Sequence, residues 1–298
     1  MPVRSYIHDA DYGRVGDFLV DIYRPDRVLR AWLQPRWEYM HFHTMSIGLP
    51  FDRIGIAEDG GRILGVVHFE HHPAFNYLQL RPGAEHVAGA LLDWADGHLG
   101  GESRSFGRKV LGLYVNDFDA NLEHLVAERG YSLSERFAED QALLVLDSPL
   151  PELAIPGGYR LTSLADDNDL RKINRVLWRG FDHEGPAPEQ EIEGRAMAQR
   201  APNFRKDLTT VAVAPNGDYA AFAGMWVVPQ NRVAYVEPVA TDPSYRRLGL
   251  GSAVVLESIR RAAAAGAQVV WVGSGLEFYR SMGFTVQNQS RLWIKPLD

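Results

Sequence analysis

The chain has 298 residues, 46% hydrophobic and 23% charged, which is typical of a globular protein with apolar material for two cores. The net charge of −7 argues against a nucleic-acid partner, and the absence of cysteine excludes disulfides, thiolate nucleophiles and cysteine metal sites. With a polar N-terminus and no apolar run near the ~20 residues that cross a bilayer, the sequence predicts a cytoplasmic protein without membrane contact.

The first half opens with a predicted strand at residues 3–7 and a helix that starts at aspartates and runs to about Tyr23. Further on, a helix over residues 122–129 ends at Gly130, because glycine is the usual C-cap residue. An apolar strand follows at residues 142–146.

The second half follows the same plan. A strand at 159–161 precedes an aspartate-capped helix to about Trp178, and a helix over 276–282 ends at Gly283 before a strand at 292–294. The nearly equal offsets between the halves predict a tandem repeat, with a chance match of common strand–helix elements as the alternative.

A twelve-residue stretch between the halves, residues 147–158, contains three prolines and two glycines and is typical of an extended linker. We therefore predict a first domain at 1–148, a linker at 149–157 and a second domain at 158–298.

Within the second domain, β-formers, an Asn-Gly turn and one long amphipathic pattern predict a mixed, mostly antiparallel sheet of the α/β class. The expected elements are strands at 209–213, 219–228 and 233–241, a helix at 251–265 and a strand at 268–272.

The most informative segment is the strand, loop and helix from Val236 to Ser252. Gly249 and Gly251 let the backbone approach a ligand where the helix begins, and free amides at a helix N-terminus attract anions. Arg246 and Arg247 add positive charge, so the loop suits a pyrophosphate. The alternative is a tight turn with solvated arginines. No P-loop Lys-Ser/Thr follows, and the third glycine of the dinucleotide fingerprint is missing.

Arg246-x-x-Gly249-x-Gly251, the preceding strand at 237–241 and the segment 279–284 resemble the GNAT superfamily, the Gcn5-related N-acetyltransferases, over residues 158–298. The resemblance implies two tandem GNAT-like domains, each a mixed sheet flanked by helices. It also implies acetyl-coenzyme A as cosubstrate.

The same resemblance implies roles for individual residues. Tyr279 would lie near the thioester sulfur as general acid, because a phenol can donate to a departing thiolate. The resemblance also implies that the amides from Arg247 through Leu248, Gly249, Leu250 and Gly251 to Ser252 bind the pyrophosphate, and that Val239 and Thr241 offer backbone bonds to the pantetheine arm. Arg246 is a further candidate because of its charge, and Ser274 because it stands where the chain departs from the family pattern.

Glu237 is the candidate general base, because an amine must lose a proton before it accepts an acetyl group. Strand alternation would place it on the same face as Val239 and Thr241. Its spacing from Arg246 resembles that of a glutamate in small-molecule members of the family; a solvent-facing or salt-bridged glutamate is the alternative.

Two regions depart from the family pattern. Where many members carry an asparagine seven residues before the tyrosine, this chain has Val272, and the turn at 273–275 supplies only Ser274. In the first domain the corresponding loop, residues 81–87, contains Pro82 and Glu85 in place of the arginine–glycine motif. We therefore expect a degenerate first domain that does not bind the coenzyme.

The sequence as a whole predicts an N-acetyltransferase that moves an acetyl group directly from acetyl-coenzyme A to the amine of a small molecule. The alternatives are a non-catalytic acyl-coenzyme A sensor and an enzyme that acetylates a protein or peptide amine. The chain is expected to be a monomer or homodimer. The histidines, including His41, His43, His71 and His72, lack partners at metal-ligand spacing, so no metal site is expected.

Overall fold

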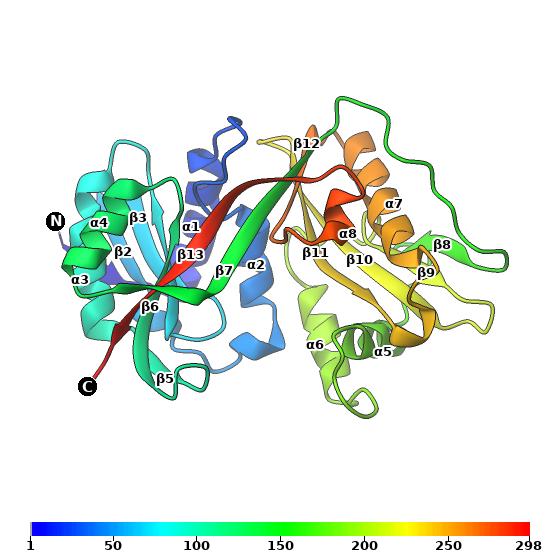
Figure 1. Cartoon of the computed structure of the whole chain (residues 1–298), viewed down its shortest axis with the longest axis horizontal. Helices are drawn as coiled ribbons and strands as arrows, with labels where there is room; N and C mark the ends of the chain where they lie inside the picture. Colours follow the sequence, from blue (N-terminus) through cyan, green and yellow to red (C-terminus); the bar gives the residue numbers. More distant parts are fainter. Residues whose placement is uncertain (1) are drawn as a thin grey trace. The chain divides into compact units, whose positions relative to one another are not determined.

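The computed structural model describes residues 2–298 and divides into two compact units (Figure 1). Unit 1 comprises residues 1–40, 45–141 and 286–298, and unit 2 comprises residues 41–44 and 142–285. Each unit is a mixed sheet flanked by helices, as predicted.

Unit 1 has a sheet with the strand order β1-β2-β3-β4-β6-β13. Its neighbouring strands are antiparallel except β4 and β6, which run parallel, and β5 pairs with β6. The strands are β1 (Val3–Ser5), β2 (Gly55–Asp59), β3 (Arg62–Phe69), β4 (Phe75–Leu80), β5 (Gly101–Ser103), β6 (Arg108–Asn116) and β13 (Thr285–Pro296). The helices are α1 (His8–Ile22), α2 (Gln34–His41), α3 (Ala88–His98) and α4 (Ala120–Glu128), with short 3-10 turns η1 (Thr44–Ser46), η2 (Phe51–Arg53) and η3 (Glu85–Val87).

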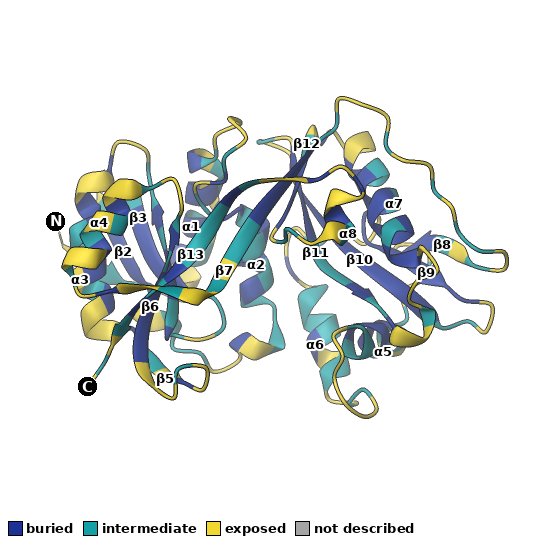
Figure 2. Ribbon diagram, viewed as in Figure 1, coloured by how far each residue is buried: buried dark blue, intermediate teal, exposed yellow. Residues whose placement is uncertain are grey.

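Unit 2 has the strand order β7-β12-β11-β10-β9-β8, with only β11 and β12 parallel. Its strands are β7 (Ser132–Val145), β8 (Arg160–Ser163), β9 (Thr210–Val213), β10 (Tyr219–Val228), β11 (Val233–Thr241) and β12 (Val269–Val272). Its helices are α5 (Leu170–Gly180), α6 (Glu191–Ala198), α7 (Leu250–Ala264) and α8 (Glu277–Arg280), with one 3-10 turn, η4 (Pro243–Tyr245). Every residue of β10 is buried, and α7 packs its apolar face on the sheet (Figure 2).

The predicted aspartate cap of the first helix is wrong, because α1 begins at His8 without a side-chain cap, but two signals in the second half are confirmed. Asp169 caps α5 through hydrogen bonds from the amides of Arg171 and Lys172, at 2.9 and 3.1 Å. The hairpin between β9 and β10 turns at Asn216–Gly217, where Gly217 has a φ of +85° that favours glycine. The three helices α2, α3 and α6 were not predicted.

The final strand of each unit comes from the other half of the sequence. Residues 142–145 of β7 pair with β12 in unit 2, and residues 290–296 of β13 pair with β6 in unit 1. The predicted division at residues 149–157 therefore differs from the two structural units at both terminal strands. The linker has no regular structure, and its Leu150, Leu153 and Ile155 pack against the core of unit 2.

A row of three aromatic side chains on adjacent strands shows the repeat. In unit 1, His68 of β3 pairs with Tyr77 of β4, which pairs with Tyr114 of β6. In unit 2, the matching row is Trp226 of β10, Tyr235 of β11 and Trp271 of β12. The first two positions differ by 158 residues and the third by 157. The two units therefore share one strand register.

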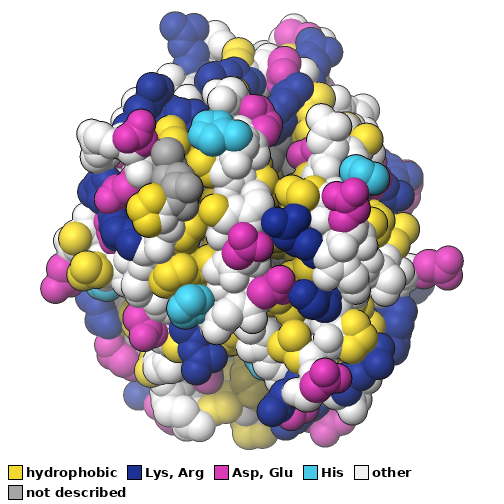
Figure 3. Space-filling model, turned by 90° about the vertical axis from the view of Figure 1, so that its left-hand side faces the viewer, with side chains coloured by type: hydrophobic (Ala, Val, Ile, Leu, Met, Phe, Trp, Pro, Cys, Tyr) yellow, Lys and Arg dark blue, Asp and Glu magenta, His cyan; other side chains and the backbone are white. Residues whose placement is uncertain are grey.

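The surface displayed in Figure 3 mixes basic and acidic side chains, without a field of one sign. Over residues 2–298, no helix is long and apolar enough to cross a membrane. In the same part of the chain, no group of three or more His, Asp or Glu side chains is arranged to hold a metal ion.

Candidate active site

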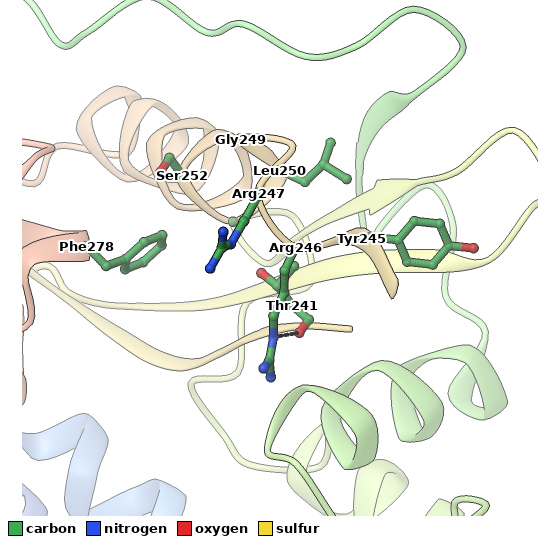
Figure 4. A pocket seen from close by; sticks show the side chains of 9 residues that line it. Thr241, Tyr245, Arg246, Arg247, Gly249, Leu250, Ser252 and Phe278 are labelled. Atoms are coloured by element: carbon green, nitrogen blue, oxygen red, sulfur yellow. Dashed lines mark hydrogen bonds between the residues drawn. The ribbon is translucent and has the colours of Figure 1, made fainter. Parts of the chain in front are cut away.

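The loop that joins β11 to α7 forms one wall of a pocket of about 430 Å³ in unit 2 (Figure 4). Phe278 of α8 lies on the opposite wall. The lining residues are Thr241, Tyr245, Arg246, Arg247, Gly249, Leu250, Gly251, Ser252 and Phe278. Seven of them are coenzyme-binding residues predicted from the sequence, while Tyr245 and Phe278 are additional.

The N-terminus of α7 is open towards this pocket. Gly249 is the N-cap residue, with a φ of +75° and no side chain to cap the helix. The amide of Ala253 donates to the Gly249 carbonyl at 3.0 Å. Within residues 2–298, the amides of residues 249–252 meet no protein acceptor at hydrogen-bonding geometry. The helix therefore presents unpaired donors and the positive end of its dipole to an anion.

Gly251 lets the loop pack closely on its neighbours. A Cβ at this position would lie 2.8 Å from Thr241 Oγ1 and 3.3 Å from the ring of Phe278. Any larger residue would therefore push the helix N-terminus away from β11 and α8.

The two arginines of the motif have different surroundings. Arg246 donates to the carbonyls of Thr241 and Gly180 at 3.2 and 3.1 Å, and to Asp182 Oδ1 at 2.8 Å. Its guanidinium therefore ties the loop to the end of α5. Arg247 is exposed and extends between the loop and Phe278 (Figure 4). Arg247 is thus the better placed of the two to meet a phosphate.

A second clamp holds the start of the loop. Asp242, whose side chain is fully buried, accepts hydrogen bonds from Arg179 Nε at 2.7 Å and from the Ser244 amide at 2.9 Å. Burial by itself would raise the pKa of Asp242, but the hydrogen bonds from Arg179 and Ser244 outweigh it and hold the pKa below its usual range. An ionised Asp242 therefore anchors η4 to α5.

Strands β11 and β12 diverge beside the pocket. They pair from Val233 to Tyr235 but no further, although β11 continues to Thr241. The Asp242 amide donates to the Ala220 carbonyl of β10. In an antiparallel ladder, every second residue of a strand hydrogen-bonds to a given neighbour. The backbone N–H and C=O groups of Val239 and Thr241 therefore point away from β10. Arg246 takes the Thr241 carbonyl. The backbone of Val239 faces the opened edge, where an extended ligand arm could bond as an added strand.

A β-bulge corrects one expectation about Glu237. Ala223 pairs with Val239 and Met225 with Val236, so Glu237 and Pro238 together oppose Gly224. Val236 and Val239 both pack into the core beneath α7. The predicted sharing of a face by Glu237 and Val239 is therefore wrong, because the extra residue reverses the alternation and leaves Glu237 on the opposite face.

The charge of Glu237 acts on Tyr279. Tyr279 is 8% exposed and packs between Phe278 and Phe284, with ring centroids 4.9 and 5.7 Å away. Burial, and next the negative charge of Glu237, raise the pKa of Tyr279 to about 12. The phenol therefore keeps its proton at neutral pH and can donate a hydrogen bond.

Five residues of the predicted site lie outside the pocket lining: Glu237, Val239, Leu248, Ser274 and Tyr279. The Ser274 hydroxyl accepts a hydrogen bond from the Leu276 amide at 3.4 Å within its own turn. Sequence reasoning missed Arg179 and Asp242. The Asp242-Pro243 pair is a typical start of a helical turn and was the available signal.

In the matching loop of unit 1, residues 81–87, a glutamate side chain hydrogen-bonds to the loop amides. The Gly83 amide donates to Glu85 Oε1 at 2.9 Å. The hydrogen bonds from the amides of Gly83 and of Glu85 itself lower the pKa of Glu85. A carboxylate of the chain thus engages the amides of this loop.

The comparisons with known proteins agree with this geometry. Residues 170–284 match the family model described as the acetyltransferase (GNAT) family. Comparison with curated protein sequences gave no match.

Three solved structures resemble nearly the whole chain. A GCN5-related N-acetyltransferase from Sphaerobacter thermophilus has a TM-score of 0.65 and 15% identity, covering 99% of this chain and 95% of that one. A tandem GNAT protein from the clavulanic acid biosynthesis pathway has a TM-score of 0.65 and 14% identity, covering 100% and 99%. A GCN5-related glucosamine N-acetyltransferase region of a fungal multi-domain β-N-acetylglucosaminidase has a TM-score of 0.57 and 16% identity, covering 99% and 38%.

The two mixed α/β units share one strand register, and unit 2 has an open helix N-terminus beside diverging strands. A solved tandem GNAT protein has the same fold. Residues 170–284 match the GNAT family model, and the whole chain has the fold of a tandem GNAT protein. This assignment supports acetyl transfer as the general activity.

Proposed function

We propose that unit 2 binds acetyl-coenzyme A at the N-terminus of α7 and transfers its acetyl group directly to the amine of a small molecule. The observation that carries the proposal is the set of unpaired amides at residues 249–252, next to the exposed Arg247. A pyrophosphate would satisfy these donors and the helix dipole together.

The remaining groups are assigned by their surroundings. The backbone of Val239 holds the pantetheine arm along the opened edge of β11. Glu237 accepts the proton that the amine loses, directly or through water. Tyr279, protonated at neutral pH, donates a hydrogen bond to the sulfur as the C–S bond breaks and negative charge develops there. The amine nitrogen forms the new bond to the acetyl carbon, so no covalent enzyme intermediate arises.

Unit 1 is proposed to lack coenzyme binding. Glu85 engages the loop amides, and Gln79 stands two residues after Tyr77, where unit 2 has Glu237 two residues after Tyr235. Gln79 is 2% exposed and accepts a hydrogen bond from the Trp32 amide at 2.9 Å. The ring of Trp32 covers His68 and Tyr77, at centroid distances of 4.5 and 4.6 Å. In unit 1, Trp32 therefore occupies the face of the sheet that carries His68 and Tyr77.

The test is thiol release from acetyl-coenzyme A across a panel of small amines. Tyr279→Phe should lower kcat about 100-fold or more, since a positioned proton donor contributes at least that much. Tyr114→Phe is the matched control, because burial raises the pKa of Tyr114 in unit 1 to about 12 as well.

The two alternative functions predict other results. Saturable coenzyme binding without turnover on any amine, and without an effect of Tyr279→Phe, would point to a sensor. Turnover on peptide N-termini or lysines alone would point to a protein acetyltransferase.

A further inference from the structure

The β-bulge of β11 at Glu237 and Pro238 depends on a glycine in the neighbouring strand β10. A Cβ at Gly224 of β10 would lie 2.2 Å from the Glu237 carbonyl oxygen and 2.8 Å from Pro238 Cδ. The displaced Glu237 carbonyl therefore occupies the space above Gly224. Any other residue at position 224 would force this carbonyl, and the carboxylate beyond it, to move.

The indole of Trp226 provides the hydrogen-bond donor for that carbonyl. Trp226 Nε1 donates to the Glu237 oxygen at 2.9 Å. The indole is itself held firmly, since Trp226 is 2% exposed and packs edge-on against Phe204 with ring centroids 5.5 Å apart. A carbonyl that the bulge removes from the regular ladder needs such a partner, because unpaired buried backbone groups are costly.

Unit 1 offers an internal reference without this arrangement. Its register runs regularly from His68–Tyr77 through Val66–Gln79, with no bulge. His68 stands at the position that corresponds to Trp226. Its Nε2 atom lies 3.0 Å from the Gln79 side-chain nitrogen. His68 therefore contacts a side chain, whereas Trp226 binds a backbone carbonyl. The β-bulge, the Trp226 donor and Glu237 thus occur together in unit 2, the unit whose helix N-terminus is open.

We propose that Trp226 is a positioning residue for acetyl transfer. By holding the Glu237 carbonyl, its N–H fixes the direction in which the Glu237 carboxylate leaves the strand relative to Tyr279. The inference rests on the proposed role of Glu237 as the base. Small displacements of a catalytic group cost up to ~100-fold in rate, so losing the indole donor should lower kcat about tenfold and leave the KM for acetyl-coenzyme A nearly unchanged.

The matched pair of variants is Trp226→Phe and Trp271→Phe. Both tryptophans are buried in the same row, but Trp271 Nε1 has no acceptor within residues 2–298, so its replacement removes a similar ring without a hydrogen bond. Acetyl transfer is measured with the amine of highest rate in the panel. In addition, the Tyr279 phenol is titrated by NMR with labelled tyrosine, which needs no acceptor.

Trp226→Phe should lower kcat relative to Trp271→Phe at an equal KM for acetyl-coenzyme A, and should shift the pKa of Tyr279. Equal kcat and an equal Tyr279 titration in the two variants would overturn the proposal. Gly224→Ala, which displaces the same carbonyl while the indole stays, should reproduce the loss of kcat and provides a second readout if Trp226→Phe does not fold.

The Glu237→Gln variant distinguishes a failure of the proposed base from a failure of the proposed role of Trp226. If this variant keeps full activity, Glu237 is not the base, and the positioning role falls with that assignment. If Glu237→Gln is inactive but Trp226→Phe matches its control, the proposed function stands and only the role of Trp226 fails. A Trp226→Phe/Glu237→Gln double variant should be no slower than Glu237→Gln alone.

Discussion

Tyr279 and Glu237, the proposed acid and base, are linked by the raised pKa of Tyr279, of which burial is the larger cause. The phenol lies between two phenylalanine rings, where its charged form is poorly solvated, and the Glu237 charge disfavours that form further. Its pKa of about 12 exceeds the ordinary ~10 of tyrosine. The folded state therefore retains a proton that the unfolded chain releases, and stability from this group is complete below pH ~10 and is lost towards pH 12.

Replacing Glu237 with glutamine should lower the pKa of Tyr279 from about 12 towards its ordinary value, because one of the two causes of the shift is removed. NMR titration of labelled tyrosine measures this directly. Glu189→Gln, which removes a carboxylate paired with the exposed Arg171, is the control. A Tyr279 titration that is identical in both variants would show that the two groups do not interact.

Gly249 is the residue on which the open helix N-terminus depends. Valine at this position should weaken coenzyme A binding at least about tenfold, because losing one hydrogen bond to a charged group costs ~1.5–3 kcal/mol. Gly266→Val carries a similar backbone strain, with a φ of +97°, at the other end of α7. Calorimetry that finds equal affinity in the two folded variants would contradict the assignment of the loop.

At the scale of elements, the loop before α7 is held by reciprocal arginine contacts with α5. Arg179 reaches from α5 to Asp242, and Arg246 reaches back from the loop to Gly180 and Asp182. Because Asp242 is buried and its pKa is lowered, its contribution to stability is present above pH ~4 and is lost as the pH falls through its folded value.

Asp242→Asn should therefore raise the KM for acetyl-coenzyme A several-fold, lower the Tm and leave kcat at saturation close to wild type, since the loop becomes less ordered while Glu237 and Tyr279 stay in place. Asp207→Asn, which removes a surface ion pair with Arg205, is the matched control. A loss confined to kcat would show that Asp242 acts on the chemistry and not on the loop.

Local signals predicted many of the helices and strands and the loop between β11 and α7, because caps, turns and periodic burial depend on residues that are close in the sequence. Asp169, Gly217 and Gly249 each act where the sequence indicated. The bulge at Glu237 could not be predicted in the same way, because it depends on Gly224, which is remote in sequence. The different surroundings of Arg246 and Arg247 likewise depend on contacts with α5.

At the scale of the whole molecule, each unit is completed by a strand from the other half of the sequence. The ends of β7 and β13 are both apolar, so either could fit either sheet, and the sequence pattern alone does not distinguish the two pairings. Residues 142–145 nevertheless cover β12 in unit 2, and residues 290–296 cover β6 in unit 1.

Fragments cut at the linker should therefore not fold independently. A fragment of residues 1–148 lacks the strand that pairs with β6, and one of residues 158–298 lacks the strand that pairs with β12. Each should aggregate because of an exposed strand edge, whereas co-expression should give a soluble pair. Two separately soluble fragments with cooperative unfolding would show that the exchanged strands are dispensable.

The amides at the start of α7 are proposed to bind the pyrophosphate of the coenzyme. The most direct measurement is an NMR titration of the amide-labelled chain with coenzyme A. We expect the amides of residues 249–252 to shift and to saturate at one coenzyme per chain, while those of the unit 1 loop at 81–87 stay in place. Saturable binding that leaves residues 249–252 unshifted, or that shifts the unit 1 loop instead, would contradict the account.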